Sequence, residues 1–206
     1  MATAAFILIG YLIGSLSFAV IVSRALGLPN PHTYGSGNPG ATNVLRTGNK
    51  LAALLTLVGD GVKGWIAVFL AQRLAWHFGV DDAGIAAAAL AVFVGHLFPV
   101  FFRFKGGKGV ATAAGVLFAI DWRIGLGTLG TWLVIAFFFR YSSLAALVAA
   151  AFAPFATALV LGFGAYAAAV LVISVLLVWR HAENIRKLFA GTESRIGEKK
   201  ASAAEG

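Results

Sequence analysis

Residues 34–46 combine chain-turning residues with small polar side chains. The segment reads Tyr-Gly-Ser-Gly-Asn-Pro-Gly-Ala-Thr-Asn-Val-Leu-Arg, in which three Gly and one Pro within six positions require a tight, irregular backbone. Backbone N–H groups left open by such a backbone suit an oxyanion, and Ser36, Asn38 and Asn43 add hydrogen-bonding side chains. The guanidinium of Arg46 offers a bidentate fork to a phosphate. Because an ordinary loop between helices uses the same turn residues, this segment alone indicates an anion site without establishing one.

A second glycine-rich segment, residues 95–112, reads Gly-His-Leu-Phe-Pro-Val-Phe-Phe-Arg-Phe-Lys-Gly-Gly-Lys-Gly-Val-Ala-Thr. Glycines that open a helix leave unpaired N–H groups and the positive end of the helix dipole facing outward. Lys105 and Lys108 add two full positive charges, so the segment predicts a phosphate cradle. It lacks the spacing and the preceding strand of a Walker A loop. His96 and Pro99 lie on an apolar stretch, where a packing or kink role is the favoured interpretation.

The third polar segment, residues 179–193, carries His181 and Asn184. Side chains three positions apart share a face if the helix continues through them. A histidine at the level of the lipid headgroups can donate a hydrogen bond, relay a proton, or cap and solvate the helix end. The residues of this segment alone do not decide among these roles.

The composition places these polar segments in a membrane protein. Hydrophobic residues make up 60% of the 206 residues and charged residues 12%, against about 45–50% and about 25% in soluble domains. With no Cys there is no thiolate nucleophile, and the 4 His are too scattered to suggest a metal cluster. We therefore expect a mechanism without metal or cofactor. The net charge of +8 is interpreted as a basic face that meets anionic lipids and substrates, and not as a nucleic-acid surface.

Seven apolar runs predict an all-α protein with seven transmembrane helices. At about 20 residues per crossing, a chain of this length holds one compact membrane domain and little else. The second run contains Asp60 and Lys63, which we expect to pair across one helical turn and to face inward, in support of the site. The runs are residues 4–22, 51–70, 84–102, 110–120, 124–139, 144–161 and 165–179.

The charge distribution predicts the topology. If the short fourth run crosses the membrane, most of the 16 Lys and Arg fall on the cytoplasmic side, as the positive-inside rule requires. The N-terminus is then outside and the C-terminus cytoplasmic, and the loop before the fourth run is sunk toward the acyl chains, inside a polar cavity. Residues 1–193 are expected to form one domain, and the polar tail 194–206 is expected to be disordered.

These motifs resemble those of the bacterial integral-membrane glycerol-3-phosphate acyltransferases that use acyl-phosphate as donor. The resemblance is carried by Gly-Ser-Gly-Asn-Pro-Gly-Ala-Thr-Asn with Arg46, by Phe-Lys-Gly-Gly-Lys-Gly-Val-Ala-Thr, by Arg-Tyr-Ser-Ser-Leu at 140–144, and by Arg-His with Asn184 and Glu193. It extends from about residue 11 to residue 193. The resemblance implies an enzyme of the bacterial inner membrane with its site on the cytoplasmic side, in the first acylation of phospholipid biosynthesis. Its substrates would be acyl-phosphate and glycerol 3-phosphate, and its products lysophosphatidic acid and phosphate.

The resemblance also assigns site residues. It associates Ser36, Arg46, Lys105 and Ser143 with glycerol 3-phosphate. It associates the loop glycines Gly106, Gly107 and Gly109, together with His181 and Asn184, with acyl-phosphate and the reacting centre. We count His181, Asn184 and Ser36 as catalytic. The expected acyl-phosphate ligands are Gly106, Gly107, Lys108, Gly109, Asn38, Asn43 and Thr112.

The residues themselves favour direct attack of the glycerol hydroxyl on the activated acyl group. No Ser-His-Asp set is evident, and preorganised donors suffice to stabilise the charge that develops on a mixed anhydride. For His181 we predict hydrogen-bond donation from a neutral imidazole, with the proton passing to the departing phosphate. The expected partners are membrane lipids and the peripheral enzyme that makes acyl-phosphate. The alternative function is a small membrane transporter for a phosphorylated solute, although no inverted repeat is visible.

Overall fold

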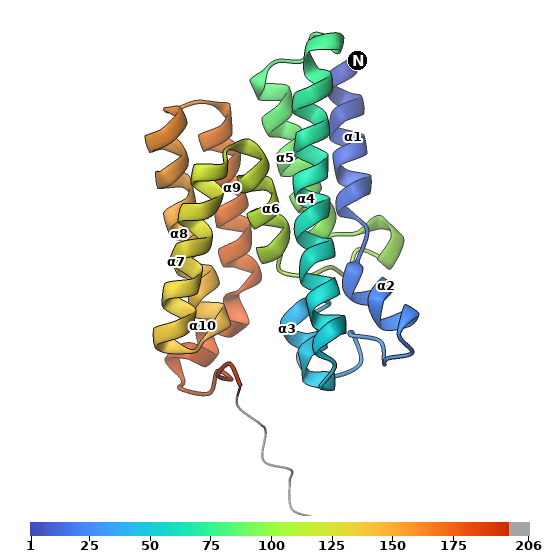
Figure 1. Cartoon of the computed structure of the whole chain (residues 1–206), viewed down its shortest axis with the longest axis vertical. Coiled ribbons are helices and arrows are strands. Elements are labelled where there is room, and N and C mark those ends of the chain that lie inside the picture. The colour runs from blue at the N-terminus through green and yellow to red at the C-terminus, as the bar shows by residue number, and fades with distance from the viewer. Residues whose placement is uncertain (198–206) are drawn as a thin grey trace, which may run out of the picture.

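The computed structural model describes residues 1–197, and all regular elements within that range are helices (Figure 1). The elements longer than one turn are α1 (Ala2–Gly14), α2 (Phe18–Ala25), α4 (Lys50–Phe78), α5 (Asp82–Leu97), α6 (Val110–Ile120), α7 (Trp122–Phe139), α8 (Ser142–Leu161), α9 (Ala165–Arg180) and α10 (Ala182–Phe189). Short turns of helix add α3 (Ala41–Val44), η1 (Leu45–Thr47) and η2 (Val100–Phe102).

Five segments are long and apolar enough to cross a membrane, and α9 with α10 would make a sixth if this bent pair is one span. The 11-residue α6 is shorter than the others. Large apolar side chains are exposed on the outer surfaces of these helices, as contact with lipid requires. The chain is therefore an all-helical, multi-pass integral membrane protein.

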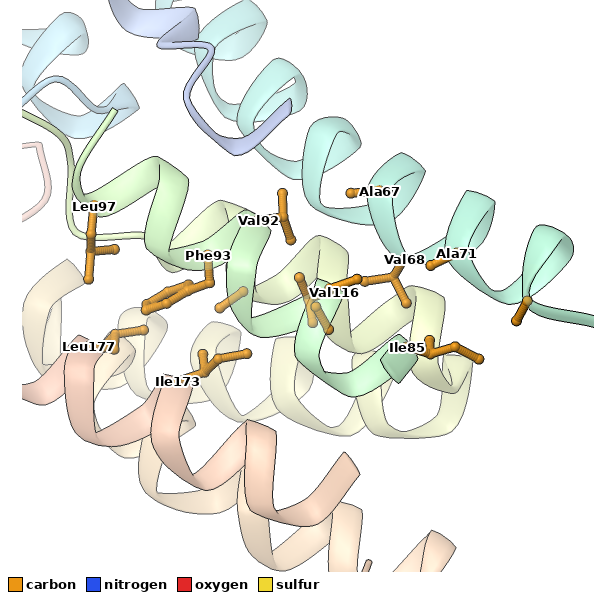
Figure 2. Packing of buried hydrophobic residues seen from close by; sticks show 14 of the residues in the cluster. Ala67, Val68, Ala71, Ile85, Val92, Phe93, Leu97, Val116, Ile173 and Leu177 are labelled. Carbon is orange, nitrogen blue, oxygen red and sulfur yellow. The ribbon is translucent and has the colours of Figure 1, made fainter. Parts of the chain in front are cut away.

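The buried core joins four helices around α5, which has the largest buried share of the candidate spans, at 61%. Figure 2 shows Val68 from α4, Phe93 from α5, Val116 from α6 and Ile173 from α9 meeting in one cluster. On either side of this core, α1 packs on α5 and α7 packs on α8. The short elements α2, α3 and α10 lie at one end of the bundle, opposite the N-terminus (Figure 1).

Helix α6 begins partway along α4, not at its end. A Cβ on Gly115 would lie 1.9 Å from the carbonyl oxygen of Gly61, so only glycine lets the two backbones come this close. Close contact between α4 and α6 draws the segment between α5 and α6 into the depth of the bundle (Figure 1). This agrees with the expectation that the loop before the fourth apolar run is sunk below the surface.

The expectation of one continuous helix over residues 4–22 is wrong, because the chain breaks between α1 and α2. At the break the hydroxyl of Ser15 donates to the Tyr11 carbonyl (2.9 Å) and accepts from the N–H of Val100 (3.3 Å). The carbonyl of Leu16, freed from the helix, accepts a hydrogen bond of 2.6 Å from Lys63. The break therefore provides the buried ammonium of Lys63 with an acceptor. In a straight helix the Leu16 carbonyl would be used by the helix itself.

Two other helix ends differ from the predicted runs. The run 84–102 ends as a helix at Leu97, because Phe98 precedes Pro99 and the residue before a proline disfavours helical backbone. The helix expected to continue through His181 instead stops at Arg180, and α10 departs at an angle of 57°. The argument that His181 and Asn184 share a face of one helix therefore fails.

The beginning of the C-terminal tail is not free. The N–H of Ile196 donates to the carbonyl of Arg140 (2.6 Å), and the Arg140 guanidinium donates back to the Ile196 carbonyl (2.9 Å). Residues 194–197 thus make tertiary contacts, unlike the disordered tail that was predicted. The rest of that tail lies outside the described residues.

Candidate active site

Four polar segments that are distant in the sequence meet at one end of the bundle. Arg46 donates to the hydroxyl of Ser194 (3.2 Å). This contact joins the first motif, defined here as residues 34–46, to the segment that follows α10. The Ser143 hydroxyl at the start of α8 donates to Glu193 (2.7 Å). Arg180 at the end of α9 reaches the glycine loop, defined here as residues 105–109. These contacts bring the polar motifs of the sequence together at one end of the bundle.

The first motif is organised by a buried asparagine. The side-chain oxygen of Asn43 accepts from the backbone N–H and the hydroxyl of Ser36, at 3.0 and 3.2 Å. Its side-chain nitrogen donates to the carbonyls of Pro31 (2.9 Å) and Tyr34 (3.2 Å). Asn43 was predicted to bind acyl-phosphate, but its amide is fully engaged in the loop and acts by shaping it. Ser36 remains exposed, with its hydroxyl held in place.

The glycine loop is held by its carbonyl groups. The guanidinium of Arg180 donates to the carbonyls of Gly106 (2.9 Å) and Gly107 (3.2 Å). The Lys108 N–H lies trans to the Gly107 carbonyl across a planar peptide and therefore points away from Arg180. Gly109 has a φ of +83°, a left-handed conformation that favours glycine, and it caps the N-terminus of α6. The loop thus keeps its carbonyls on one side and presents N–H groups at a helix start.

Arg180 and Glu193 received no site role from the sequence. Both residues lie within the motifs at 179–193, but neither has a spacing that predicts its partner. Glu193 accepts from Ser143 and from the Asn184 side chain, each at 2.7 Å, and Lys108 donates to the oxygen of the same Asn184 amide. The resulting chain of contacts links three predicted ligands through one unpredicted carboxylate.

Lys108 is half-buried in this network. Burial lowers the pKa of Lys108 below its ordinary value, and the carboxylates of Glu193 and Glu183 oppose that shift. A partly desolvated cation attracts an anion more strongly than one in bulk water does, since the local dielectric constant is lower. Lys108 is therefore well placed to interact with a phosphate at the start of α6.

His181 lies at the junction of α9 and α10 and is only 3% exposed. Its Nδ1 is 2.8 Å from the Leu177 carbonyl oxygen. A carbonyl can only accept, so Nδ1 carries the proton, and in the neutral ring Nε2 is left as an acceptor. Because its single N–H is used by Leu177, neutral His181 has none left for the substrate, which contradicts the prediction that it donates a hydrogen bond to the reacting group. Asn184 forms no hydrogen bond with His181 in the described part of the chain.

The charged pair predicted in the second apolar run is confirmed. Asp60 and Lys63 are each 3% exposed, and their charged atoms are 2.8 Å apart. His96 joins them, with its Nδ1 2.9 Å from the Lys63 nitrogen. The interpretation of His96 as a simple packing or kink residue is therefore wrong.

The remaining predicted ligands are placed apart from this network. The Thr112 hydroxyl is fully buried and donates to the Asp60 carbonyl (3.0 Å), so it fixes α6 to α4. Asn38 folds its amide over Gly40. Lys105 is exposed beside a hollow of about 300 Å³, whose other lining residues are Val20, Asn30, His32, Phe101, Phe102 and Arg103.

The fold and the site together define a membrane-embedded protein with a basic, glycine-rich polar face at one end of its helices. A family model described as glycerol-3-phosphate acyltransferase matches residues 4–191. Proteins named glycerol-3-phosphate acyltransferase from Cupriavidus taiwanensis and Ralstonia pickettii are 69% and 66% identical to this chain. The alignments cover 97% and 98% of the chain and 99% and 98% of the relatives.

Solved structures agree with the sequence relatives. The chain resembles crystal structures of an integral membrane glycerol 3-phosphate acyltransferase, PlsY (YgiH), in a glycerol 3-phosphate form and in a lysophosphatidic acid form. The TM-scores are 0.88 and 0.87 at 36% identity, with 96% of each chain covered. The chain therefore belongs to the glycerol-3-phosphate acyltransferase family, whose members are acyltransferases of phospholipid synthesis.

Proposed function

We propose that the protein transfers a fatty acyl group from acyl-phosphate to the 1-hydroxyl of glycerol 3-phosphate. The products are lysophosphatidic acid and inorganic phosphate, and no cofactor or metal takes part. The observation that carries this proposal is the glycine loop at the start of α6, whose Gly106 and Gly107 carbonyls are held by Arg180, which leaves the helix N-terminus and Lys108 to receive an anion. A small, highly charged donor such as acyl-phosphate fits this cradle.

The proposed location is the bacterial inner membrane, with seven crossings and the site on the cytoplasmic side. Helix α6 then counts as a short crossing, and the polar end of the bundle, which carries Arg46, Arg140, Arg180 and Arg186, faces the cytoplasm. The N-terminus lies outside and the C-terminus inside. Both substrates carry phosphate and reach this side from the cytoplasm or along the inner leaflet.

Glycerol 3-phosphate is proposed to bind between the first motif and α8. Arg46 supplies a guanidinium to its phosphate, and Ser36 and Ser143 supply hydroxyls held by Asn43 and Glu193. Lys105, in the neighbouring hollow, adds positive charge that draws the anion in. Within this proposal Ser36 orients the substrate and does not act as a nucleophile, because no base activates its hydroxyl in the described structure.

The acyl-phosphate headgroup is proposed to lie on the glycine loop near His181. The attacking hydroxyl oxygen forms a bond to the acyl carbon, and the bond between that carbon and the phosphate oxygen breaks. The hydroxyl proton is accepted by Nε2 of His181, which the Nδ1 contact with Leu177 leaves free of a proton. The phosphate leaves on the N-terminus of α6, where Lys108 and the helix dipole stabilise its charge.

An apolar hollow between α8 and α9 suits the acyl chain. It has a volume of about 310 Å³, and it is lined by Ala150, Ala151, Pro154, Leu171, Ser174, Val175 and Val178. Val178 is one helical turn from His181. A chain attached to a phosphate on the glycine loop can therefore enter this hollow from the end where the reaction takes place.

The test uses purified protein in lipid nanodiscs with acyl-phosphate and glycerol 3-phosphate. Release of phosphate and formation of lysophosphatidic acid at equal rates supports the proposal, and acyl-CoA serves as the control donor. Transfer from acyl-CoA alone would contradict the proposed donor. The small transporter remains the second candidate from the sequence, but family membership favours the enzyme. Uptake of glycerol 3-phosphate by proteoliposomes, without product, would instead support transport.

A further inference from the structure

His96 has one ring nitrogen, Nε2, that none of the hydrogen bonds or ion pairs of the described residues involves. The residue is 7% exposed, and its Nδ1 faces Lys63. Its Nε2 has no hydrogen-bond partner among residues 1–197. Nε2 is not among the fully buried, unpaired polar atoms of the described residues, so this nitrogen keeps some access to a ligand or to water.

Lys63 determines which nitrogen of His96 carries the proton. The ammonium of Lys63 contacts the Leu16 carbonyl at 2.6 Å, Asp60 at 2.8 Å and His96 Nδ1 at 2.9 Å. An ammonium has three protons and no lone pair, so it can only donate to Nδ1. Asp60 Oδ1 lies 3.6 Å from the same Nδ1, too far to accept a hydrogen bond from it. The proton of the neutral imidazole is therefore on Nε2, which makes His96 a hydrogen-bond donor on that side. This is the opposite tautomer to that of His181.

The free Nε2 lies where the two anion-binding motifs touch. A Cβ built on Gly107 would lie 2.3 Å from His96 Nε2 and 3.1 Å from the Pro39 carbonyl oxygen. The His96 carbonyl also accepts the N–H of Gly107, at 3.2 Å. The donor therefore lies directly behind the glycine loop, beside the first motif, and any side chain at position 107 would cover it.

We propose that His96 is a substrate-binding residue, whose Nε2–H donates a hydrogen bond to a phosphoryl oxygen held at the junction of the two motifs. This inference rests on the proposed function, because it takes the phosphate of that reaction as the ligand. Asp60 and Lys63 act as positioning residues, since they reach substrate only through His96. This role accounts for the three buried polar side chains, Asp60, Lys63 and His96, in an apolar helix bundle. Without a functional role, packed apolar residues could replace them with no loss of stability.

The first measurement reads the ring directly, without turnover. Protein labelled with ¹⁵N-histidine is titrated with inorganic phosphate, and the four His are distinguished by single His→Gln variants. We expect His96 in the Nε2–H tautomer, with an Nε2 signal that shifts on phosphate addition. The exposed His77, near the opposite end of α4, should not respond. In Lys63→Met the single tautomer should be lost.

The second measurement compares two substitutions in the acyl-transfer assay. Gln can accept from Lys63 through its oxygen and donate through its nitrogen, so His96→Gln should stay within a few-fold of wild type. His96→Leu removes the donor and should lower kcat/KM by about 10- to 100-fold, the range for a hydrogen bond to a charged group. His77→Gln is the matched control with unchanged kinetics.

The outcomes separate this inference from the proposed function. If the wild type transfers no acyl group from acyl-phosphate while His96 still responds to phosphate, the proposed function fails and the binding role stands. If the wild type is active but the His96 signal is insensitive to phosphate, the inference is overturned. Equal loss of activity in His96→Gln and His96→Leu would also overturn it, since a purely structural residue would behave in that way. The ring measurement on the wild type decides the matter even if His96→Leu does not fold.

Discussion

Replacement of His181 tests the proposed route of the proton. Its Nδ1–H contact with Leu177 leaves Nε2 as an acceptor. In the proposed mechanism His181 therefore acts on the glycerol hydroxyl as a base, and not as a hydrogen-bond donor. General bases contribute about 10²–10⁴-fold to rate. We therefore expect both His181→Gln and His181→Ala to lose about 10²–10⁴-fold in kcat, because Gln can neither accept nor carry the proton at neutral pH.

Stability must be separated from chemistry in this experiment. Loss of the hydrogen bond to Leu177 should cost about 0.5–1.5 kcal/mol of unfolding free energy, and truncation of a side chain that is 3% exposed adds a packing term in the Ala variant. Gln fills more of the space and is the better folded reference. Thermal unfolding in nanodiscs, followed by single-turnover kinetics, measures the two quantities separately.

Added imidazole provides the rescue arm. It should restore part of the activity of His181→Ala and none of that of His181→Gln, whose side chain occupies the same space. If correctly folded His181→Gln keeps activity within about tenfold of wild type, then a hydrogen-bonding side chain suffices. The departing phosphate would then be the base, and the assignment of His181 would be refuted.

Three further experiments test the phosphate contacts, the glycine loop and the topology. Arg46→Ala and Lys105→Ala should each raise KM for glycerol 3-phosphate. Each should also lower kcat/KM by the factor that corresponds to a loss of about 2–4 kcal/mol of transition-state stabilisation. Wild-type kinetics in both variants would remove the phosphate-binding role. Arg180→Met loses both hydrogen bonds to the glycine loop and should lower kcat by about tenfold or more, whereas an unchanged kcat would show that the loop is held without it. Single Cys labels on this Cys-free chain test the topology, with Ala190→Cys expected to react only from the cytoplasm and Gly164→Cys only from outside; external labelling at position 190 would refute the seven-span arrangement.

The sequence predicted the helices and the clustering of the motifs because both depend on local patterns. Apolar runs and turn-rich segments are visible in any short window of sequence, and the positive-inside rule arranges them on two sides. The pairing of Asp60 with Lys63 was also predictable, since residues three apart in a helix are neighbours.

The contacts that sequence reasoning missed depend on tertiary structure. The break after α1 leaves the Leu16 carbonyl free of the helix, and Lys63 from α4, which is 47 residues away in the sequence, satisfies it. The tautomer of His181 follows from a distance to Leu177, which no sequence pattern reports. Glu193 and Ser143 are 50 residues apart and meet only when the chain after α10 folds back.

The buried pair of Asp60 and Lys63 bears on how the protein enters the bilayer. An isolated charge is costly to insert, but here the two opposite charges lie one turn apart on the same helix. The middle of helix α4, between Lys50 and Arg73, can therefore partition into lipid without net charge before its neighbours are in place. His96 and the Leu16 carbonyl then reach the Lys63 ammonium as the helices associate, so polar contacts select the correct neighbours during assembly in lipid, where apolar surfaces distinguish poorly between partners.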